Sequence, residues 1–216
     1  MSLTVGVPKE TFPEERRVAM TPGGFDRLAK AGMRFLIEKG AGDAAGFPDS
    51  EYAAKGASLV PRDEVFAQAD VLLQVRTLGA NPEAGKADTN RLRQGQIVIG
   101  MAEPLTELES VATLAKAGVT LFAMELIPRI TRAQAMDVLS SMASIAGYKA
   151  VLLAASALPR LFPMMTTAAG TIAPARVLVI GAGVAGLQAI ATARRLGAVV
   201  SGYDVRSAVK EQIESL

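Results

Sequence analysis

The chain has 216 residues, half of them hydrophobic and a fifth charged, with a formal net charge of +2. This composition is typical of a globular protein with room for one large domain or two smaller ones, and it excludes a disordered chain. Because the sequence contains neither cysteine nor histidine, disulfides and cysteine-ligated metals are excluded, we expect no metal site, and the most common general acid or base is missing.

Neither nucleic acid nor a lipid bilayer is indicated as a direct partner. Basic residues form no run long enough to suggest nucleic acid. The amino terminus, MSLTVGVPKE, lacks the basic start and apolar core of a secretion signal. The apolar run from Val138 to Leu158 contains Lys149 and several serines, which make it too polar for a helix exposed to lipid. We therefore expect a soluble polypeptide, one that could still dock on a membrane protein.

The first part of the chain alternates short apolar runs with helical patterns. Expected strands lie at LTVGVP, RFLIEKG, VLLQV, IVIGM and TLFAME, and expected helices lie around residues 24–32, 50–56, 63–69 and 105–118. Strands that alternate with helices of this length predict βαβ units and a mostly parallel sheet. Residues 1–133 are therefore predicted to form one α/β domain.

A long helix is expected next, from about Gln134 to Leu158, where a proline ends it. Gln134, Asp137 and Ser141 fall on one face, and apolar residues recur at helical spacing on another. The apolar face consists of Ala135, Val138, Leu139, Met142 and Ile145. Residues 134–160 are predicted to connect two domains, and the loop FPMMTTAAGTIAPA that follows marks a domain boundary.

Residues 161–216 predict the start of a second α/β domain. It has a strand at Arg176–Ile180, a helix at Ala185–Leu196, a second strand at Val199–Tyr203 and a helical start that stops at Leu216. A doubly wound nucleotide-binding domain usually has about six strands. We therefore predict an α/β fold of two Rossmann-like, doubly wound parallel-sheet domains joined by a long helix. The second domain is incomplete in this chain, and we expect the folded form to continue beyond Leu216.

The strongest motif is RVLVIGAGVAGLQAIATARRLGAVVSGYD. Gly181, Gly183 and Gly186 give the spacing G-x-G-x-x-G directly after an apolar strand and at the opening of a helix. The first glycine permits a tight turn, the second lets the backbone approach a pyrophosphate, and the third allows close packing of helix on strand. The helix N-terminus offers N–H groups and a positive dipole end to the phosphates. A glycine triplet alone indicates only a tight turn, but in this strand–turn–helix–strand context it predicts a dinucleotide site.

Asp204, at the end of the next strand, is expected to accept hydrogen bonds from the ribose hydroxyls. A 2′-phosphate ~4 Å from this carboxylate would meet a repulsion of about 4 kcal/mol at an effective dielectric of ~20. This favours NAD over NADP even after a severalfold discount for solvent. Arg206, two residues later, could instead partner a phosphate, or it could be a solvated surface charge.

Four stretches together resemble a known family: PKETFPEERRVAMTP, PRITRAQAMDVLSS, FPMMTTAAGT and GAGVAGLQAIATARRLGAVVSGYDVR. They are similar to the alanine dehydrogenase/transhydrogenase family, and in particular to the NAD(H)-binding alpha subunit of proton-translocating NAD(P) transhydrogenases. The resemblance covers essentially the whole chain. The first motif and the glycine motif are shared with alanine dehydrogenase, whereas PRITRAQAMD distinguishes the transhydrogenases.

The resemblance implies which residues meet the nicotinamide end of NAD(H). An arginine, a glutamine, an aspartate and a serine do so in the family, and they match Arg129, Gln134, Asp137 and Ser140 here. The residues alone leave an alternative open, because Thr131 and Gln134 fit the T-x-x-Q capping-box pattern and Asp137 near a helix start favours the dipole.

At the other end of the cofactor, the resemblance implies that further residues of the glycine motif bind NAD(H) with the three glycines and Asp204. They are Val184, Val205 and Arg206.

The resemblance also implies an oxidoreductase subunit that binds NAD(H) in a cleft between two domains. It would pass hydride to NADP+ held on a separate NADP-binding beta subunit, while an integral membrane subunit couples the exchange to proton translocation. The subunit would be a homodimer, cytoplasmic and peripheral on the inner face of the cell membrane through its partners. Direct hydride transfer requires proximity, orientation and exclusion of water. We therefore expect no catalytic side chain, and the absence of histidine is compatible with this function.

Two alternatives stay open. An NAD-dependent, alanine-type dehydrogenase needs a positioned acid or base, and the positions where that family has a histidine and a lysine carry Glu103 and Arg76 here. Glu103 could serve as a base only with a raised pKa, and Arg76 cannot readily do so. Arg17 matches the carboxylate-binding arginine of the dehydrogenases, or it has a structural role with a neighbouring acid. The other alternative is a non-catalytic NAD-binding or regulatory module.

Overall fold

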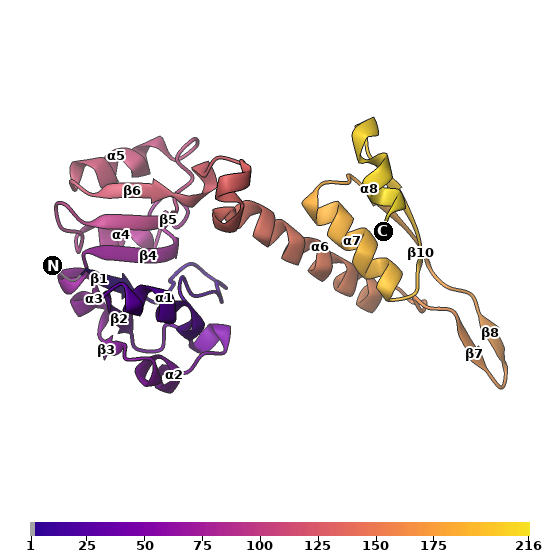
Figure 1. Cartoon of the computed structure of the whole chain (residues 1–216), viewed down its shortest axis with the longest axis horizontal. Helices are drawn as coiled ribbons and strands as arrows, with labels where there is room; N and C mark the ends of the chain where they lie inside the picture. Colours follow the sequence, from indigo (N-terminus) through magenta and orange to yellow (C-terminus); the bar gives the residue numbers. More distant parts are fainter. Residues whose placement is uncertain (1–2) are drawn as a thin grey trace. The chain divides into compact units, whose positions relative to one another are not determined.

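The structure, a computed structural model, describes residues 3–216. The chain divides into two compact units, of which one ends at Met136 and the other runs from Asp137 to Leu216. Figure 1 labels the helices and strands of both. Each unit is described by itself below.

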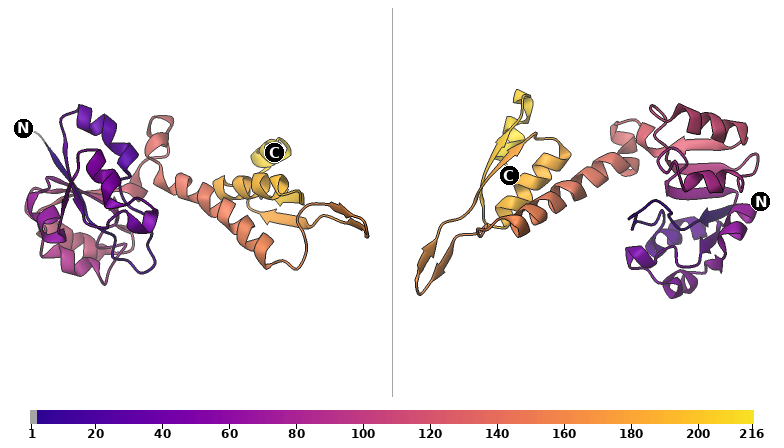
Figure 2. Two further views of the ribbon diagram at one scale, coloured as in Figure 1. Left: turned by 90° about the horizontal axis from the view of Figure 1, so that it is seen from below. Right: turned by 180° about the vertical axis from the view of Figure 1, so that it is seen from behind.

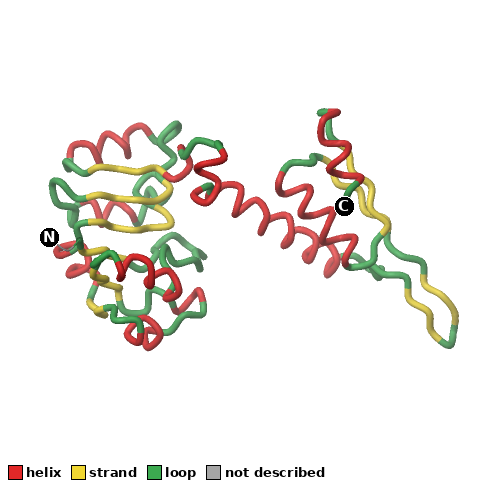
Figure 3. The backbone as a smooth tube through the Cα atoms, viewed as in Figure 1, coloured by secondary structure: helices red, strands yellow, loops and turns green. Residues whose placement is uncertain are grey.

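The first unit is built on a six-stranded parallel sheet in the order β3-β2-β1-β4-β5-β6. This order is that of a doubly wound nucleotide-binding fold, and it reverses between β1 and β4. Figure 3 shows the strands separated by helices along the chain. The strands are β1 Thr4–Val7, β2 Arg34–Glu38, β3 Ser58–Val60, β4 Val71–Arg76, β5 Ile97–Met101 and β6 Thr120–Ala123. The predicted parallel α/β architecture is confirmed.

Short helices connect these strands. They are α1 Phe25–Lys30, α2 Asp49–Ala54, α3 Arg62–Gln68, α4 Gly85–Thr89 and α5 Leu108–Lys116, with 3-10 turns η1 Pro22–Gly24, η2 Asp43–Ala45, η3 Met124–Leu126 and η4 Thr131–Met136. The four helices that the sequence predicts match α1, α2, α3 and α5 within a few residues.

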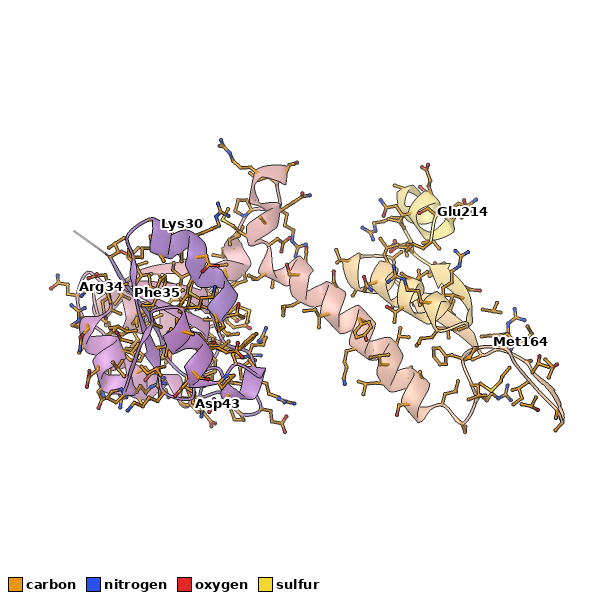
Figure 4. All side chains as sticks on the ribbon, turned by 60° about the horizontal axis from the view of Figure 1, so that its bottom comes forward. Lys30, Arg34, Phe35, Asp43, Met164 and Glu214 are labelled. Carbon is orange, nitrogen blue, oxygen red and sulfur yellow. The ribbon has the colours of Figure 1, made fainter. Side chains whose placement is uncertain are left out.

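A hydrophobic core lies on each face of this sheet, because alternate strand residues point to opposite sides. On one face, Phe35 of β2 stacks on Phe25 of α1 with ring centroids 4.3 Å apart, and Tyr52 of α2 joins the same cluster. Phe35 is labelled in Figure 4. On the other face, Leu72 of β4 packs with Phe66 of α3. Because helices cover both faces of the sheet, polar side chains can gather at the carboxyl ends of its strands.

The second unit contains a long helix, a hairpin and one βαβ unit. Its elements are α6 Val138–Ala157, β7 Met165–Thr167, β8 Gly170–Ile172, β9 Arg176–Ile180, α7 Val184–Arg195, β10 Val199–Tyr203, η5 Ser207–Val209 and α8 Lys210–Glu214. β9 and β10 are parallel and α7 connects them, while β7 and β8 form an antiparallel pair. Figure 2 shows the hairpin extending beyond the βαβ unit from both directions of view.

One face of the β9–β10 pair carries the core of this unit. Val177 and Val200, which are partners in the register, pack with Ala193 of α7 and Val151 of α6. The opposite face of the pair is solvent-exposed and largely apolar, with Leu178, Ile180, Val199 and Tyr203 among its side chains.

Helix α6 approaches α7 through small residues and not through the apolar face that the sequence pattern identifies. A Cβ on Gly147 would lie 2.1 Å from the backbone oxygen of Ala185, so the two backbones are in direct contact. Gly147 and Val151 are buried, whereas Leu139 and Ile145 of the predicted apolar face are exposed. The periodicity of large side chains does not reveal this contact, because the close approach requires small ones.

By length and composition α6 is apolar enough to cross a membrane, and it is the one such helix in residues 3–216. The expectation that Lys149 and the serines make it too polar is therefore not supported by this criterion. Helices of soluble proteins can meet the same criterion, and α6 packs one of its faces on α7 within the second unit.

Two further predictions are corrected, and two short elements were missed. The α-helix expected from Gln134 begins only at Val138, because η4 comes before it and the side chain of Asp137 caps its first turn. The segment expected to be a loop contains the β7–β8 hairpin. Strand β3 and helix α4 were not predicted; they span only three and five residues, too short to show a period.

Candidate functional site

The glycine motif forms the turn from β9 into α7. β9 ends at Ile180, and Gly181 follows with φ +93, a left-handed conformation that side chains with a Cβ rarely adopt. Its N–H donates to the carbonyl of Tyr203 at 2.7 Å, which ties the turn to the end of β10. Gly183 is the N-cap residue of α7, so the first N–H groups of that helix face outward from the turn without intrahelical partners.

The other two glycines differ in what surrounds them. A Cβ on Gly186 would lie 1.7 Å from the carbonyl oxygen of Gly181, so only glycine lets α7 start this close to β9. A Cβ on Gly183 would meet no heavy atom of the described residues within 4 Å, its chain neighbours excepted. The space beside Gly183 is therefore open to a group that approaches the backbone, and the positive end of α7 favours an anion there.

Asp204 lies at the carboxyl end of β10 and holds the turn from the other side. Its Oδ2 accepts from the N–H of Ala182 at 2.7 Å, and its Oδ1 accepts from the N–H of Arg206 at 2.8 Å. The guanidinium of Arg206 adds two bonds of 3.0 Å, from Nε to Oδ1 and from the terminal nitrogen to Oδ2. The Asp204 side chain is only 7% exposed.

These bonds fix the charge of Asp204. The Arg206 guanidinium, followed by the N–H groups of Arg206 and Ala182, holds the pKa of the Asp204 carboxyl far below its usual range. The same pair raises the pKa of Arg206. A carboxylate thus stands beside the glycine turn at any physiological pH, as the acceptor that ribose hydroxyls require.

The structure brings most of the residues predicted for this end of the cofactor into one corner of the second unit. Val184 opens α7 and Val205 follows Asp204, and both side chains are exposed. Sequence reasoning missed Ala182, whose backbone N–H orients Asp204. No sequence signal identifies a backbone donor of this kind, because any residue other than proline at position 182 would supply it.

The residues matched to the nicotinamide end are divided between the two compact units. Arg129 and Gln134, in the first unit, have exposed side chains, for which the described residues provide no hydrogen bond. Asp137 and Ser140, in the second unit, bond each other: Asp137 accepts from the Ser140 N–H at 2.9 Å and from its hydroxyl at 2.7 Å. Asp137 therefore caps α6, and the T-x-x-Q capping box is not what starts the α-helix.

A second polar cluster lies in the first unit at the carboxyl ends of β1 and β4, where the strand order reverses. Glu15 accepts from Arg17 through both carboxylate oxygens at 2.7 and 2.6 Å, and Arg76 donates to it at 3.0 Å. Arg76 also lies over the ring of Phe12, 4.2 Å from its centroid. Both arginines considered for substrate carboxylate binding thus already bind a carboxylate of the protein, as the structural interpretation of Arg17 anticipated.

Of the acidic residues at the carboxyl ends of these strands, sequence reasoning considered only Glu103 and missed Glu10 and Glu15. Hydrogen bonds from Arg17, and to a smaller extent from Arg76, lower the pKa of Glu15 to about 2, although burial opposes this shift. Burial raises the pKa of Glu10, which accepts from the N–H groups of Val75 and Arg76.

Glu103 has an exposed side chain, and its backbone lies in the left-handed region with φ 50. Its N–H donates to Glu125 at 2.6 Å.

The chain matches two domains of one family along nearly its whole length. Residues 6–146 match the alanine dehydrogenase/PNT N-terminal domain, and residues 150–216 match the alanine dehydrogenase/PNT C-terminal domain. A solved structure of transhydrogenase from Sinorhizobium meliloti superposes with a TM-score of 0.92 and 48% sequence identity, over 98% of this chain and 59% of that one.

Curated relatives agree with the structural match. The chain is 47% identical over 215 residues to NAD(P) transhydrogenase subunit alpha from Cereibacter sphaeroides, which covers 99% of this chain and 40% of the relative. It is 34% identical over 223 residues to alanine dehydrogenase from Mycobacterium tuberculosis, which covers 99% of this chain and 56% of the relative. The chain thus spans about half the length of these relatives. By its two matched domains, it belongs to the alanine dehydrogenase/PNT family of oxidoreductases.

Proposed function

We propose that this chain is the NAD(H)-binding part of a transhydrogenase that passes hydride between NADH and NADP+. The observation that carries the proposal is the glycine turn with its acid: open space beside Gly183, the N-terminus of α7, and the Asp204 carboxylate at the ends of two parallel strands. These features fit a dinucleotide, whose diphosphate needs backbone donors and whose ribose needs an acceptor. Identity favours the transhydrogenase over the dehydrogenase, at 47% against 34%.

The nucleotide would supply the hydride, and the residues of this chain would bind and orient it. Gly181, Gly183 and Gly186 would shape the diphosphate site, with Val184, Val205 and Arg206 around the ribose. The exposed Arg129 and Gln134 and the capping pair Asp137–Ser140 would contact the nicotinamide end and fix which face of the ring is presented. Two side chains of that group are already held rigidly by their mutual bonds, which suits a positioning role.

In this proposal no side chain of the chain acts as acid or base, since hydride passes directly between two nicotinamides. NADP(H) would be held by a separate beta subunit, and an integral membrane subunit would couple the exchange to proton translocation. The chain would be a homodimer at the cytoplasmic face of the cell membrane. Residues 1–133, 134–160 and 161–216 would serve as the N-terminal domain, the connecting helix and the start of the NAD-binding domain.

The test is an exchange assay with purified components. The protein is mixed with the NADP-binding component, and hydride exchange is followed between NADH and an NADP analogue. Gly183→Val should abolish exchange by filling the diphosphate space, since a Cβ at this position meets no heavy atom of the described residues within 4 Å, its chain neighbours excepted. Gly23→Val is the matched control, because Gly23 is equally unobstructed but belongs to the first unit.

The outcomes separate the candidate functions. Exchange that appears only in the mixture, and that Gly183→Val removes, supports the proposal. Oxidation of alanine by the protein alone would establish a dehydrogenase instead, in which Arg17 and Arg76 would have to release Glu15. NAD binding without either activity would indicate a non-catalytic binding module.

A further inference from the structure

The carboxylate of Asp204 has no acceptor position left for a ribose. A carboxylate offers about four lone-pair sites, and four N–H donors already occupy those of Asp204. Two come from the backbone, at Ala182 and Arg206, and two from the guanidinium of Arg206. A ribose that binds here through its hydroxyls must therefore replace some of these donors.

The side-chain donors are the replaceable ones. The two backbone N–H groups belong to the glycine turn and to the chain just after β10, so they keep the carboxylate in place. The Arg206 side chain is 59% exposed, and within the described residues its guanidinium has no hydrogen-bond or ion-pair partner other than Asp204. Asp204 is largely buried, whereas the guanidinium lies on the solvent side of the pair, so the arginine side chain can leave the carboxylate for water without moving the backbone.

We propose that Arg206 is a displaceable occupant of the ribose position and thereby sets both the affinity for NAD(H) and the discrimination against NADP(H). This inference rests on the proposed function, because it assumes that a dinucleotide binds at the glycine turn. While it is paired, the guanidinium competes with the ribose hydroxyls for the oxygens of Asp204. Once displaced, it remains two residues away as a cation that partly offsets the repulsion between Asp204 and a 2′-phosphate.

The two effects of removing Arg206 have opposite signs for the two cofactors. NAD+ should bind more tightly to Arg206→Gln by a factor of about two to five, the worth of one ion pair whose cation is solvent-exposed. NADP+ should bind less tightly, because the charge of Asp204 is then uncompensated. The ratio of the two affinities should therefore change more than either affinity does. Arg206→Lys keeps the positive charge but lacks the planar two-donor fork, so it should restore the NADP+ affinity while leaving NAD+ binding improved.

The experiment is a calorimetric titration of the purified protein with NAD+ and, separately, with NADP+. The variants are Arg206→Gln, Arg206→Lys and Lys210→Gln. Lys210→Gln is the matched control, because it removes the same charge four residues away. The Lys210 side chain is 78% exposed and pairs with Glu214. The expected result is tighter NAD+ binding with weaker NADP+ binding in Arg206→Gln, tighter NAD+ binding with restored NADP+ binding in Arg206→Lys, and no change for either cofactor in Lys210→Gln.

Three results would overturn the inference. Equal or weaker binding of NAD+ by Arg206→Gln would show that the pair does not compete with the ribose. If Arg206→Gln weakened the binding of NAD+ and NADP+ by the same factor and lowered the melting temperature, the Asp204–Arg206 pair would have only a structural role. The same change in Lys210→Gln would indicate a general effect of charge. If the unaltered protein binds neither cofactor and Gly183→Val changes nothing, the proposed function fails first and this inference falls with it.

Discussion

Gly186 packs so closely on Gly181 that a Cβ added to it would lie 1.7 Å from the Gly181 carbonyl oxygen. That oxygen belongs to the backbone, which cannot turn aside as a flexible side chain would. Gly186→Ala should therefore force α7 away from β9 and lower the free energy of unfolding by about 2 kcal/mol or more, as for other overpacked sites. Urea unfolding followed by circular dichroism measures the change.

Gly183→Ala is the matched variant for this prediction, since the same methyl group meets open space there and the backbone is extended, with φ −79. It should lower the free energy of unfolding by no more than about 1 kcal/mol, the cost of replacing a glycine N-cap by alanine, and weaken dinucleotide binding, because the methyl group stands where the diphosphate approaches. Equal losses of stability in both variants would mean that the turn is not packed as the structure has it.

Substitutions of Asp137 and Gln134 can distinguish a structural role from a cofactor-binding role in residues that lie close together in the sequence. Asp137 caps α6 through the Ser140 N–H, so Asp137→Ala should lower the free energy of unfolding by about 1 kcal/mol, and Asp137→Asn, a comparable cap, by less. Gln134→Ala should leave stability unchanged, because its exposed side chain makes no hydrogen bond to the described residues. If the nicotinamide assignment is right, Gln134→Ala and Asp137→Asn both weaken NADH binding several-fold in a titration. Unchanged NADH affinity in Gln134→Ala would remove that residue from the site.

The parts of the fold that could be predicted are those with a strong local signal. β9 and β10 were predicted at the bounds that the structure gives, because β9 carries four apolar residues in a row directly before the glycine motif, and β10 follows the helix of that motif at the spacing of a βαβ unit. β3 and α4 were missed because their few residues complete no period, and the β7–β8 hairpin because its side chains are all exposed. The start of α6 at Val138 depends on a side-chain cap at Asp137 that competes with an equally plausible one at Thr131.

The site also has predictable and unpredictable parts. Gly181, Gly183 and Gly186 could be predicted from their spacing, since a left-handed turn and close helix packing each require glycine at a fixed offset. The pairing of Glu15 with Arg76 could not be predicted, because 61 residues separate them and only the strand order brings the ends of β1 and β4 together. The bonds from Arg206 to Asp204 were also unpredictable, as a residue two positions away could equally have faced solvent or a phosphate.

Arg62 joins three separate segments of the first unit, so its loss should be costly. It donates to Glu38 at 2.7 Å, to the carbonyl of Lys9 at 2.8 Å and to both oxygens of Asp88. Both carboxylates are largely buried. Arg62→Met would leave Glu38 without its cation and Asp88 with only Arg91, 3.5 Å away, and we expect the free energy of unfolding to fall by about 3–5 kcal/mol. Lys55→Met breaks the exposed pair with Asp26 and should cost at most about 1 kcal/mol. Similar losses in the two variants would contradict the structural role of Arg62.

Glu15 gives the stability of the first unit a defined dependence on pH. Its pKa of about 2 lies below the ordinary value of 4.5, chiefly because Arg17 donates to its carboxylate. A depressed pKa in the folded state means that the ionised group stabilises the fold above pH ~4.5, and that this contribution is lost as the pH falls toward 2.

Glu15→Gln should lower the free energy of unfolding by about 1–3 kcal/mol at pH 7. The gap between the two proteins should close between pH ~4.5 and ~2, where the unaltered carboxyl also becomes neutral. Urea unfolding at pH 7, 4.5, 3 and 2 measures the gap, with Glu83→Gln, at an exposed position of the same unit, as the control that should show none. A gap that stays constant with pH would mean that Glu15 stabilises the fold by its shape and not by its charge.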